Sequence, residues 1–169
     1  MKPSEHPEFY RLAPPEGRSR ESTIRLDREG HFTHDGAPVE HPKLRDAMHT
    51  WIKRHPDDGR YILDNGYDWT YVTIDEAPFF VTHLKLGSGA PTLALSDGTE
   101  EELNEPLTEA ADGALFTQVK RQLPGGPFDA KFSRHAQTEL SPLLEERDGH
   151  AVVRVGEREI VVSSRKNAS

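Results

Sequence analysis

A small basic cluster stands at the start of the second of two predicted helices. Lys131, Ser133 and Arg134 follow the flexible Gly125-Gly126-Pro127 stretch. Free backbone N–H groups and the positive end of a helix dipole attract phosphate or carboxylate, and adjacent cationic side chains strengthen the capture. The alternative is structural: Ser133 caps the helix while the cations face water. The structural interpretation is favoured, and anion binding stays open as a hypothesis.

A group of histidines raises the question of a metal site. His31, His34, Asp35 and His41 lie within a short stretch of chain, and imidazole together with carboxylate suits a divalent metal. On a strand, however, His31 and His34 would face opposite sides. We therefore interpret them as surface and turn histidines, and the sequence predicts no metal site.

An aromatic row is the third candidate. Tyr67, Trp69 and Tyr71 share one face of a predicted strand and could stack a base or another flat ligand. The favoured alternative is a half-buried face of a sheet.

Motifs that would define an enzyme are absent from the sequence. It has no phosphate loop ending in Gly-Lys-Ser/Thr, no His-Glu-x-x-His and no Gly-x-Ser-x-Gly. The acidic residues show neither a cleft nor a defined separation of the kind that a hydrolytic carboxylate pair requires. The sequence therefore predicts no catalytic residues and no cofactor, and it favours a protein that is not an enzyme.

Composition narrows the class further. The 169 residues include 21 Lys and Arg against 29 Asp and Glu, a formal charge of −8, and no Cys. This charge disfavours binding to nucleic acid or to an anionic membrane. The absence of Cys excludes disulfides and thiolate ligands. No secretory signal and no apolar run long enough to span a bilayer is present, so the expectation is a soluble cytoplasmic protein.

Two helices, each followed by a β-hairpin, are expected to position these residues. The first helix–hairpin pattern covers residues 42–74 and the second covers 136–162. Their apolar residues fall at helical spacing: Leu44, Ala47, Met48, Trp51 and Ile52 in the first copy, and Ala136, Leu140, Leu143 and Leu144 in the second. A shift of 92 positions maps Leu44 onto Ala136 and Met48 onto Leu140. The pattern indicates a duplicated unit.

The predicted fold class is therefore α+β, with two tandem units of similar structure (β-hairpin, helix, β-hairpin) that share an interface. The predicted divisions are a disordered arm over 1–22, a first unit over 23–90, a second over 91–163 and a flexible tail over 164–169. Within the second unit we expect a polar loop over 96–113. We also expect a helix over 131–147 that Pro142 kinks or restarts.

Several of these stretches resemble the bacterial domain-of-unknown-function family 1285. The resemblance rests on residues 24–39, 42–44, 58–63, 74–81 and 128–135 and on the closing hairpin, and it covers most of the chain from 23 to 163. It implies a duplicated α+β core whose second half looks superficially like a pleckstrin-homology fold. It also implies a ligand site at the interface of the halves, for a nucleotide-like molecule, and a role in signalling. The sequence departs from the family's pattern at residues 64–68 and at Pro142.

Three functional hypotheses follow. The first is a small-molecule binding or signalling module whose nucleotide-like ligand lies between the halves. Its expected ligand-binding residues are Asp75, Glu76, Phe79, Lys131, Ser133 and Arg134. The second is an adaptor that binds a protein partner through a sheet edge or the aromatic face. The third, and least favoured, is a metal-assisted hydrolase that uses the histidines between His31 and His41.

Overall fold

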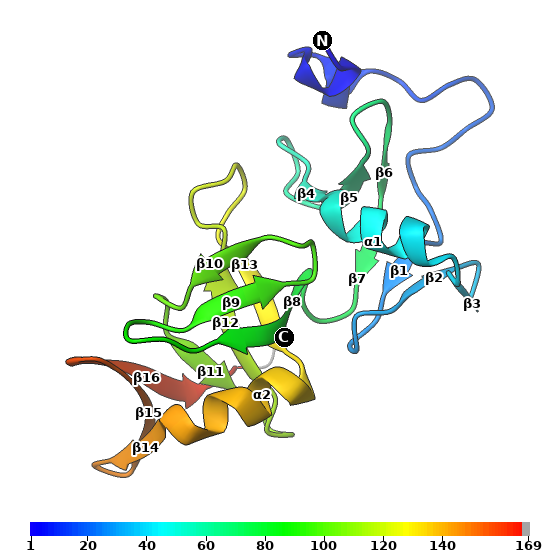
Figure 1. Ribbon diagram of the computed structural model, residues 1–169. Coiled ribbons are helices and arrows are strands. Elements are labelled where there is room, and N and C mark those ends of the chain that lie inside the picture. The colour runs from blue at the N-terminus through cyan, green and yellow to red at the C-terminus, as the bar shows by residue number, and fades with distance from the viewer. Residues whose placement is uncertain (167–169) are drawn as a thin grey trace. The chain divides into compact units, whose positions relative to one another are not determined.

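The computed structural model describes residues 1–166 and shows a sheet-rich α+β fold with two α-helices in that part of the chain (Figure 1). The chain divides into two compact units. Unit 1 contains Met1–Pro78 and Leu123–Gly125, and unit 2 contains Phe79–Gln122 and the chain from Gly126 onward. None of the described helices has the length and apolar character needed to span a bilayer.

Unit 1 holds two small sheets and one helix. The four-stranded sheet has the order β3-β2-β1-β7, and the three-stranded sheet has the order β4-β5-β6. Their bounds are β1 (Arg25–Leu26), β2 (Phe32–His34), β3 (Ala37–Pro38), β4 (Ile52–Arg54), β5 (Tyr61–Asp64), β6 (Trp69–Tyr71) and β7 (Thr73–Ile74). β1 and β7 pair in parallel, whereas the other neighbours are antiparallel.

Helix α1 (Pro42–Thr50) begins and ends for identifiable reasons. The His41 side chain caps it by accepting a hydrogen bond from the Leu44 N–H, and Pro42 occupies the first turn, where no N–H is needed. The apolar spacing predicts a helix that includes Ile52, but the structure corrects this. Ile52 pairs with Leu63 as the first residue of β4, so the helix ends two residues earlier.

The first 22 residues, expected as a disordered arm, contain two short 3₁₀-helices, η1 (Pro3–Glu5) and η2 (Phe9–Arg11). Phe9 is buried against Ile62 and Trp69. The Tyr10 hydroxyl donates to Asp64 Oδ2 at 2.7 Å. The buried His55 accepts at Nδ1 from the Asp57 N–H, so its Nε2 donates to the Tyr10 carbonyl at 3.0 Å. Phe9 and Tyr10 therefore hold this segment against the rest of unit 1.

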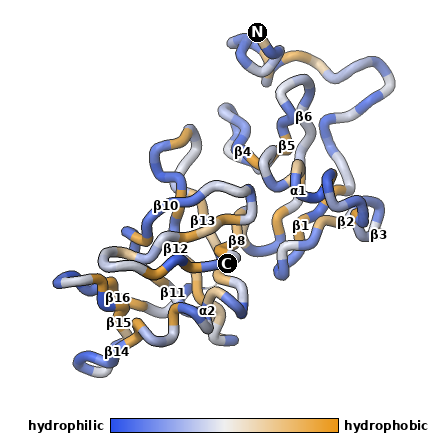
Figure 2. Tube along the Cα trace, in the orientation of Figure 1, coloured by the Kyte–Doolittle hydropathy of each residue, from blue (hydrophilic) through white to orange (hydrophobic). Residues whose placement is uncertain are grey.

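Unit 2 is built on a nine-stranded sheet of order β10-β9-β8-β13-β12-β11-β16-β15-β14. The bounds are β8 (Phe79–Lys85), β9 (Thr92–Leu95), β10 (Glu100–Glu102), β11 (Leu107–Glu109), β12 (Leu115–Val119), β13 (Phe128–Phe132), β14 (Leu144–Arg147), β15 (His150–Val155) and β16 (Arg158–Ser164). β8 pairs in parallel with β13, and β11 with β16. Apolar residues, coloured orange, occur along β8 and β13 (Figure 2).

Helix α2 (Arg134–Leu140) packs on β8 and β13 and buries Ala136 and Leu140 completely. The helix expected over 131–147 is wrong in its bounds. Lys131 lies in β13, and after α2 the chain forms a 3₁₀ turn, η3 (Ser141–Leu143), and then β14. Pro142 has no N–H to continue the helix, and β14 gains a ladder with β15 instead.

The stretch 96–113, expected as a loop, contains β10 and β11. β10 consists of three glutamates and pairs with β9 across the turn at Gly98. A charged strand at the edge of a sheet carries no apolar alternation, so its sequence does not show the strand. The boundary expected between residues 90 and 91 differs from that of the units, because β8 pairs with β9 and β13 and so belongs to unit 2. Of the tail expected over 164–169, Ser164 is the last residue of β16, and residues 167–169 lie outside the described part.

Both units contain the same local order of elements. A β-hairpin (β2–β3 or β12–β13) precedes each helix, and an antiparallel three-stranded meander (β4–β5–β6 or β14–β15–β16) follows it. The meander of unit 1 is a sheet by itself, whereas that of unit 2 forms one end of the large sheet.

Candidate functional site

Two of the six residues expected to bind a ligand lie in unit 1, just after β7. Arg25 Nη1 contacts Asp75 Oδ1 at 2.9 Å, and Arg28 Nε contacts Glu76 Oε2 at 3.2 Å. The Asp75 N–H also donates to the Leu26 carbonyl. These contacts tie the end of β7 to β1 and the turn after it.

The other four residues lie in unit 2. Phe79 is buried and packs edge-to-face on Phe128, with 5.5 Å between ring centroids. Lys131 Nζ lies 5.9 Å from the centroid of the Phe116 ring. Each of these two side chains therefore contacts an aromatic ring of its own unit.

Ser133 caps α2, and Arg134, the first residue of that helix, is exposed. The Ser133 hydroxyl oxygen accepts from the Ala136 N–H at 3.1 Å and so occupies an amide that an anion would use. α2 has only seven residues, which leaves a short dipole. The structural interpretation of this cluster accounts for the contacts of Ser133, and anion binding stays a prediction.

The histidines between 31 and 41 do not converge. His31 Nδ1 lies 3.8 Å from Asp27, His34 Nε2 lies 3.7 Å from Asp35, and His41 caps α1. Within the described residues, no set of three metal-ligating side chains forms around them. The constellation proposed for a hydrolase is therefore not assembled.

The aromatic row is also divided. Tyr67 is exposed and lies before β6, whereas Trp69 is buried by the N-terminal segment. Trp69 Nε1 donates to the Phe9 carbonyl at 3.4 Å, and the Arg20 guanidinium lies over its ring at 4.5 Å. This face is a packing surface, as the structural alternative holds.

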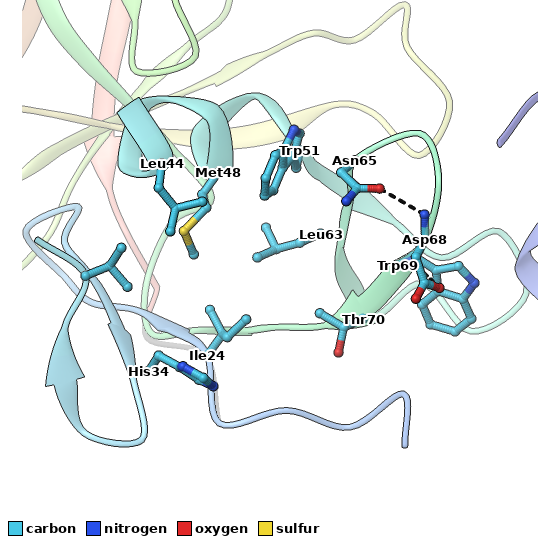
Figure 3. Close-up of a pocket in the computed structure, with 11 residues that line it drawn as sticks. Ile24, His34, Leu44, Met48, Trp51, Leu63, Asn65, Asp68, Trp69 and Thr70 are labelled. Carbon is cyan, nitrogen blue, oxygen red and sulfur yellow. Dashed lines mark hydrogen bonds between the residues drawn. The ribbon is translucent and has the colours of Figure 1, made fainter. Parts of the chain in front are cut away.

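The described part of unit 1 contains a pocket of about 300 Å³ beside α1 (Figure 3). Most of its wall is apolar. The lining residues are Ile24, His34, Val39, Leu44, Met48, Trp51, Leu63, Asn65, Asp68, Trp69 and Thr70. Figure 3 shows Met48 of α1, Leu63 of β5 and Ile24 directed towards one another. Leu44 is 43% exposed, so the apolar face of α1 is incompletely covered at this point.

Polar groups lie at one part of the pocket wall. Asn65 Oδ1 accepts from the N–H groups of Tyr67 and Asp68, which holds the β5–β6 turn. Burial raises the pKa of Asp68, but hydrogen bonds from Arg20 and the Trp69 N–H outweigh it, so the pKa lies below its usual value. Asp68 is therefore an anion at neutral pH. Among the described lining residues there is no lysine and no arginine.

The lining of this pocket comes from several separate segments that no sequence motif connects. One signal was present. Leu44 and Met48 were recognised as the apolar face of a helix, but the spacing does not show what covers that face.

The fold defines a sheet-rich α+β protein, and two solved structures are similar to it. A DUF1285 family protein from Silicibacter pomeroyi DSS-3 aligns with TM-score 0.66 and 17% identity, over 90% of this chain and 91% of that chain. A DUF1285 family protein from Shewanella baltica OS155 aligns with TM-score 0.52 and 16% identity, over 73% of this chain and 94% of that chain. No protein-family model and no curated protein matches the sequence. The resemblance to the domain-of-unknown-function family 1285 is confirmed at the level of the fold.

Proposed function

We propose that the protein is a small-molecule binding module and that its ligand occupies the pocket beside α1 in unit 1. The observation that carries the proposal is an apolar pocket of about 300 Å³ with a few polar groups at its wall. Ligand sites are typically concave and mostly apolar, with a small number of polar groups that fix orientation. Filling this pocket with an apolar ligand would complete the packing that the exposed Leu44 lacks.

The size and charge of the pocket narrow the ligand. Its volume is at the lower end of the range for ligand pockets, which suits a single ring system more than a whole nucleotide. A phosphate would meet the Asp68 carboxylate, which already pairs with Arg20, and no lysine or arginine belongs to the described wall. We therefore expect the ligand to resemble only the base of a nucleotide. Such a ligand is a flat, uncharged or cationic ring whose polar edge faces Asn65, Asp68 or His34.

The site expected at Asp75, Glu76, Phe79, Lys131, Ser133 and Arg134 remains a second location for the same function. The internal duplication and the signalling role belong to this proposal as well. Support for the duplication is the shared order of hairpin, helix and meander in the two units. A binding module that does no catalysis would signal because its ligand-bound form interacts differently with another molecule than its free form does.

The adaptor hypothesis has less support. An added strand would need an open edge of a sheet, and charged residues disfavour such pairing. The two end strands of the large sheet are Glu100–Glu102 and Leu144–Arg147, and both carry glutamates. Small-molecule binding is therefore the better-supported proposal.

A thermal-shift screen with a pocket-filling variant tests the proposal. Nucleobases, nucleosides and aromatic amines are the probes, and both tryptophans lie in unit 1, so their fluorescence reports on that unit. A ligand at a hundred times its Kd adds about 2.7 kcal/mol to the free energy of unfolding. Val39→Phe should remove this gain because the new ring occupies the pocket. The matched control is Val161→Phe, the same change at an exposed position of unit 2.

Stabilisation of the wild type and of Val161→Phe, but not of Val39→Phe, supports the pocket. Equal stabilisation of all three proteins places the ligand elsewhere. A screen in which no ring compound stabilises the wild type counts against small-molecule binding as a whole.

A further inference from the structure

Three side chains that can ligate a metal converge on one surface of unit 2. They are His83 of β8 and His135 and Glu139 of α2. His135 Nε2 lies 3.1 Å from Glu139 Oε1, and His83 Nδ1 lies 3.9 Å from the same oxygen. One ligating atom of each residue lies within 4.8 Å of the others.

The fold positions these groups for reasons that are separate from any metal. His135 and Glu139 are one helical turn apart, so they share a face of α2. α2 is held against β8 by the buried Ala136 and Leu140. An irregularity in the β8–β9 register occurs between Val81 and His83, and such bulges redirect side chains.

Glu139 is held in place by the backbone of β8. Its Oε1 accepts from the Leu84 N–H at 3.1 Å. A hydrogen bond to a ligating carboxylate is the usual means of orienting it toward a metal, and it leaves lone pairs for coordination. The His83 and His135 rings meet edge-to-face with 5.0 Å between centroids. One nitrogen of each ring lies within 4.8 Å of the other and of a Glu139 oxygen.

The spacing matches the needs of a tetrahedral ion. With bonds of about 2.0–2.1 Å, neighbouring ligand atoms of a tetrahedral zinc lie about 3.3 Å apart. The two nitrogen–oxygen distances, 3.1 and 3.9 Å, bracket that value, and all three ligand atoms lie within 4.8 Å of one another, so rotations of the two exposed histidine side chains would bring them to that spacing. Two imidazoles favour a transition metal over Mg²⁺ or Ca²⁺, which prefer oxygen ligands.

We propose that His83, His135 and Glu139 bind a divalent transition metal such as Zn²⁺. Two imidazole nitrogens and one carboxylate oxygen supply three ligands, and water or an anionic group takes the fourth position. The metal would join α2 to β8. The proposal does not depend on the small-molecule pocket, because all three ligands belong to unit 2.

Metal titration of tag-free protein tests the proposal. After treatment with a chelator and its removal, Zn²⁺ binding is measured by isothermal titration calorimetry at neutral pH and physiological salt. We expect one saturable site, weakened at least about tenfold by His83→Ala or by Glu139→Gln, since losing even a group that only orients a metal ligand costs that much affinity. Glu139→Gln keeps an oxygen acceptor for the Leu84 N–H, so its effect separates lost coordination from lost structure.

The matched control is His31→Ala, which removes an exposed histidine that also lies beside carboxylates and is not part of the pocket wall. It should bind Zn²⁺ as the wild type does. Co²⁺ provides an independent reading: a visible absorption band should saturate at one equivalent in the wild type and be absent from His83→Ala. No saturable binding by the wild type, or equal affinity of His83→Ala and the wild type, would overturn the proposal.

Discussion

The two helix–meander segments of this protein have the same order of elements but opposite surroundings. In unit 1, α1 leaves Leu44 43% exposed beside a pocket. In unit 2, the corresponding face of α2 is closed, and Ala136 and Leu140 are completely buried. The outer face of α2 carries His135 and Glu139 instead. Apolar spacing therefore specifies a helix. The elements packed against that helix determine whether its apolar face lines a cavity or is buried in a core.

The largest expected difference is between the costs in free energy of unfolding of alanine substitutions on the apolar faces of α1 and α2. Leu140→Ala should lower the free energy of unfolding of unit 2 by about 2–5 kcal/mol, because it opens a cavity in a closed core. Leu44→Ala should cost no more than about 1 kcal/mol, because its side chain is already half exposed. Urea denaturation followed by circular dichroism measures the first, and tryptophan fluorescence measures the second. Equal costs would contradict the contrast between the helices.

Unit 2 contains a buried ion pair whose contribution to stability should be lost in acid. Lys120 Nζ lies 2.8 Å from Asp97 Oδ2, and both side chains are at most 10% exposed. Burial raises the pKa of Asp97, but hydrogen bonds from Lys120 and Thr99 lower it further, so the folded pKa is below the usual value. The stabilisation is therefore complete above the unfolded pKa of about 3.9 and is lost as pH falls through the folded pKa.

Asp97→Asn should accordingly cost about 1–3 kcal/mol at pH 7. The cost should shrink below about pH 4, because the Asp97 carboxylate of the unfolded wild type begins to bind a proton there, before the carboxylate of the folded protein does. Thermal denaturation of both proteins across pH 2–7 measures the difference. A cost that is independent of pH would show that the ion pair does not stabilise unit 2.

The smallest expected effect on stability comes from Tyr10 of unit 1, whose contribution should be lost at alkaline pH. Burial, together with the hydrogen bond to Asp64 and its negative charge, raises the pKa of Tyr10 above its usual value. A raised folded pKa stabilises the protein below the unfolded pKa of about 10, and this stabilisation is lost as pH rises through the folded pKa.

Tyr10→Phe should cost about 1 kcal/mol at neutral pH, because Asp64 keeps its contacts with Lys53 and the Gly66 N–H. The cost should decrease above about pH 10. Tryptophan fluorescence during urea denaturation provides the measurement. If Tyr10→Phe were as stable as the wild type at pH 7, the N-terminal segment would not be held by this contact.

The sequence predicted local elements better than their surroundings. The hairpins β5–β6 and β15–β16 form within the two expected helix–hairpin segments, as their turn residues and alternation indicate. Turn chemistry and alternation act over a few residues, so they can be read directly. The acidic β10 was missed because its three glutamates show no apolar alternation, and β13 was missed because its parallel pairing with β8 joins segments that are distant in sequence.

The candidate sites were harder to predict for the same reason. The pocket is lined by residues from Ile24 to Thr70, and no spacing connects them. The His135–Glu139 spacing is visible in the sequence, but His83 lies about fifty residues earlier on a different strand. Only the fold brings the three together.

Chemical-shift mapping by two-dimensional NMR with a ring compound from the screen tests whether a ligand binds in the pocket beside α1. The largest chemical-shift changes should occur at the Trp51 indole and at Leu63 and Asn65, which line this pocket. Val39→Phe should abolish them. Changes centred instead on Lys131 and Arg134, with none at Trp51, would contradict the account and return the ligand to the site first predicted from the sequence.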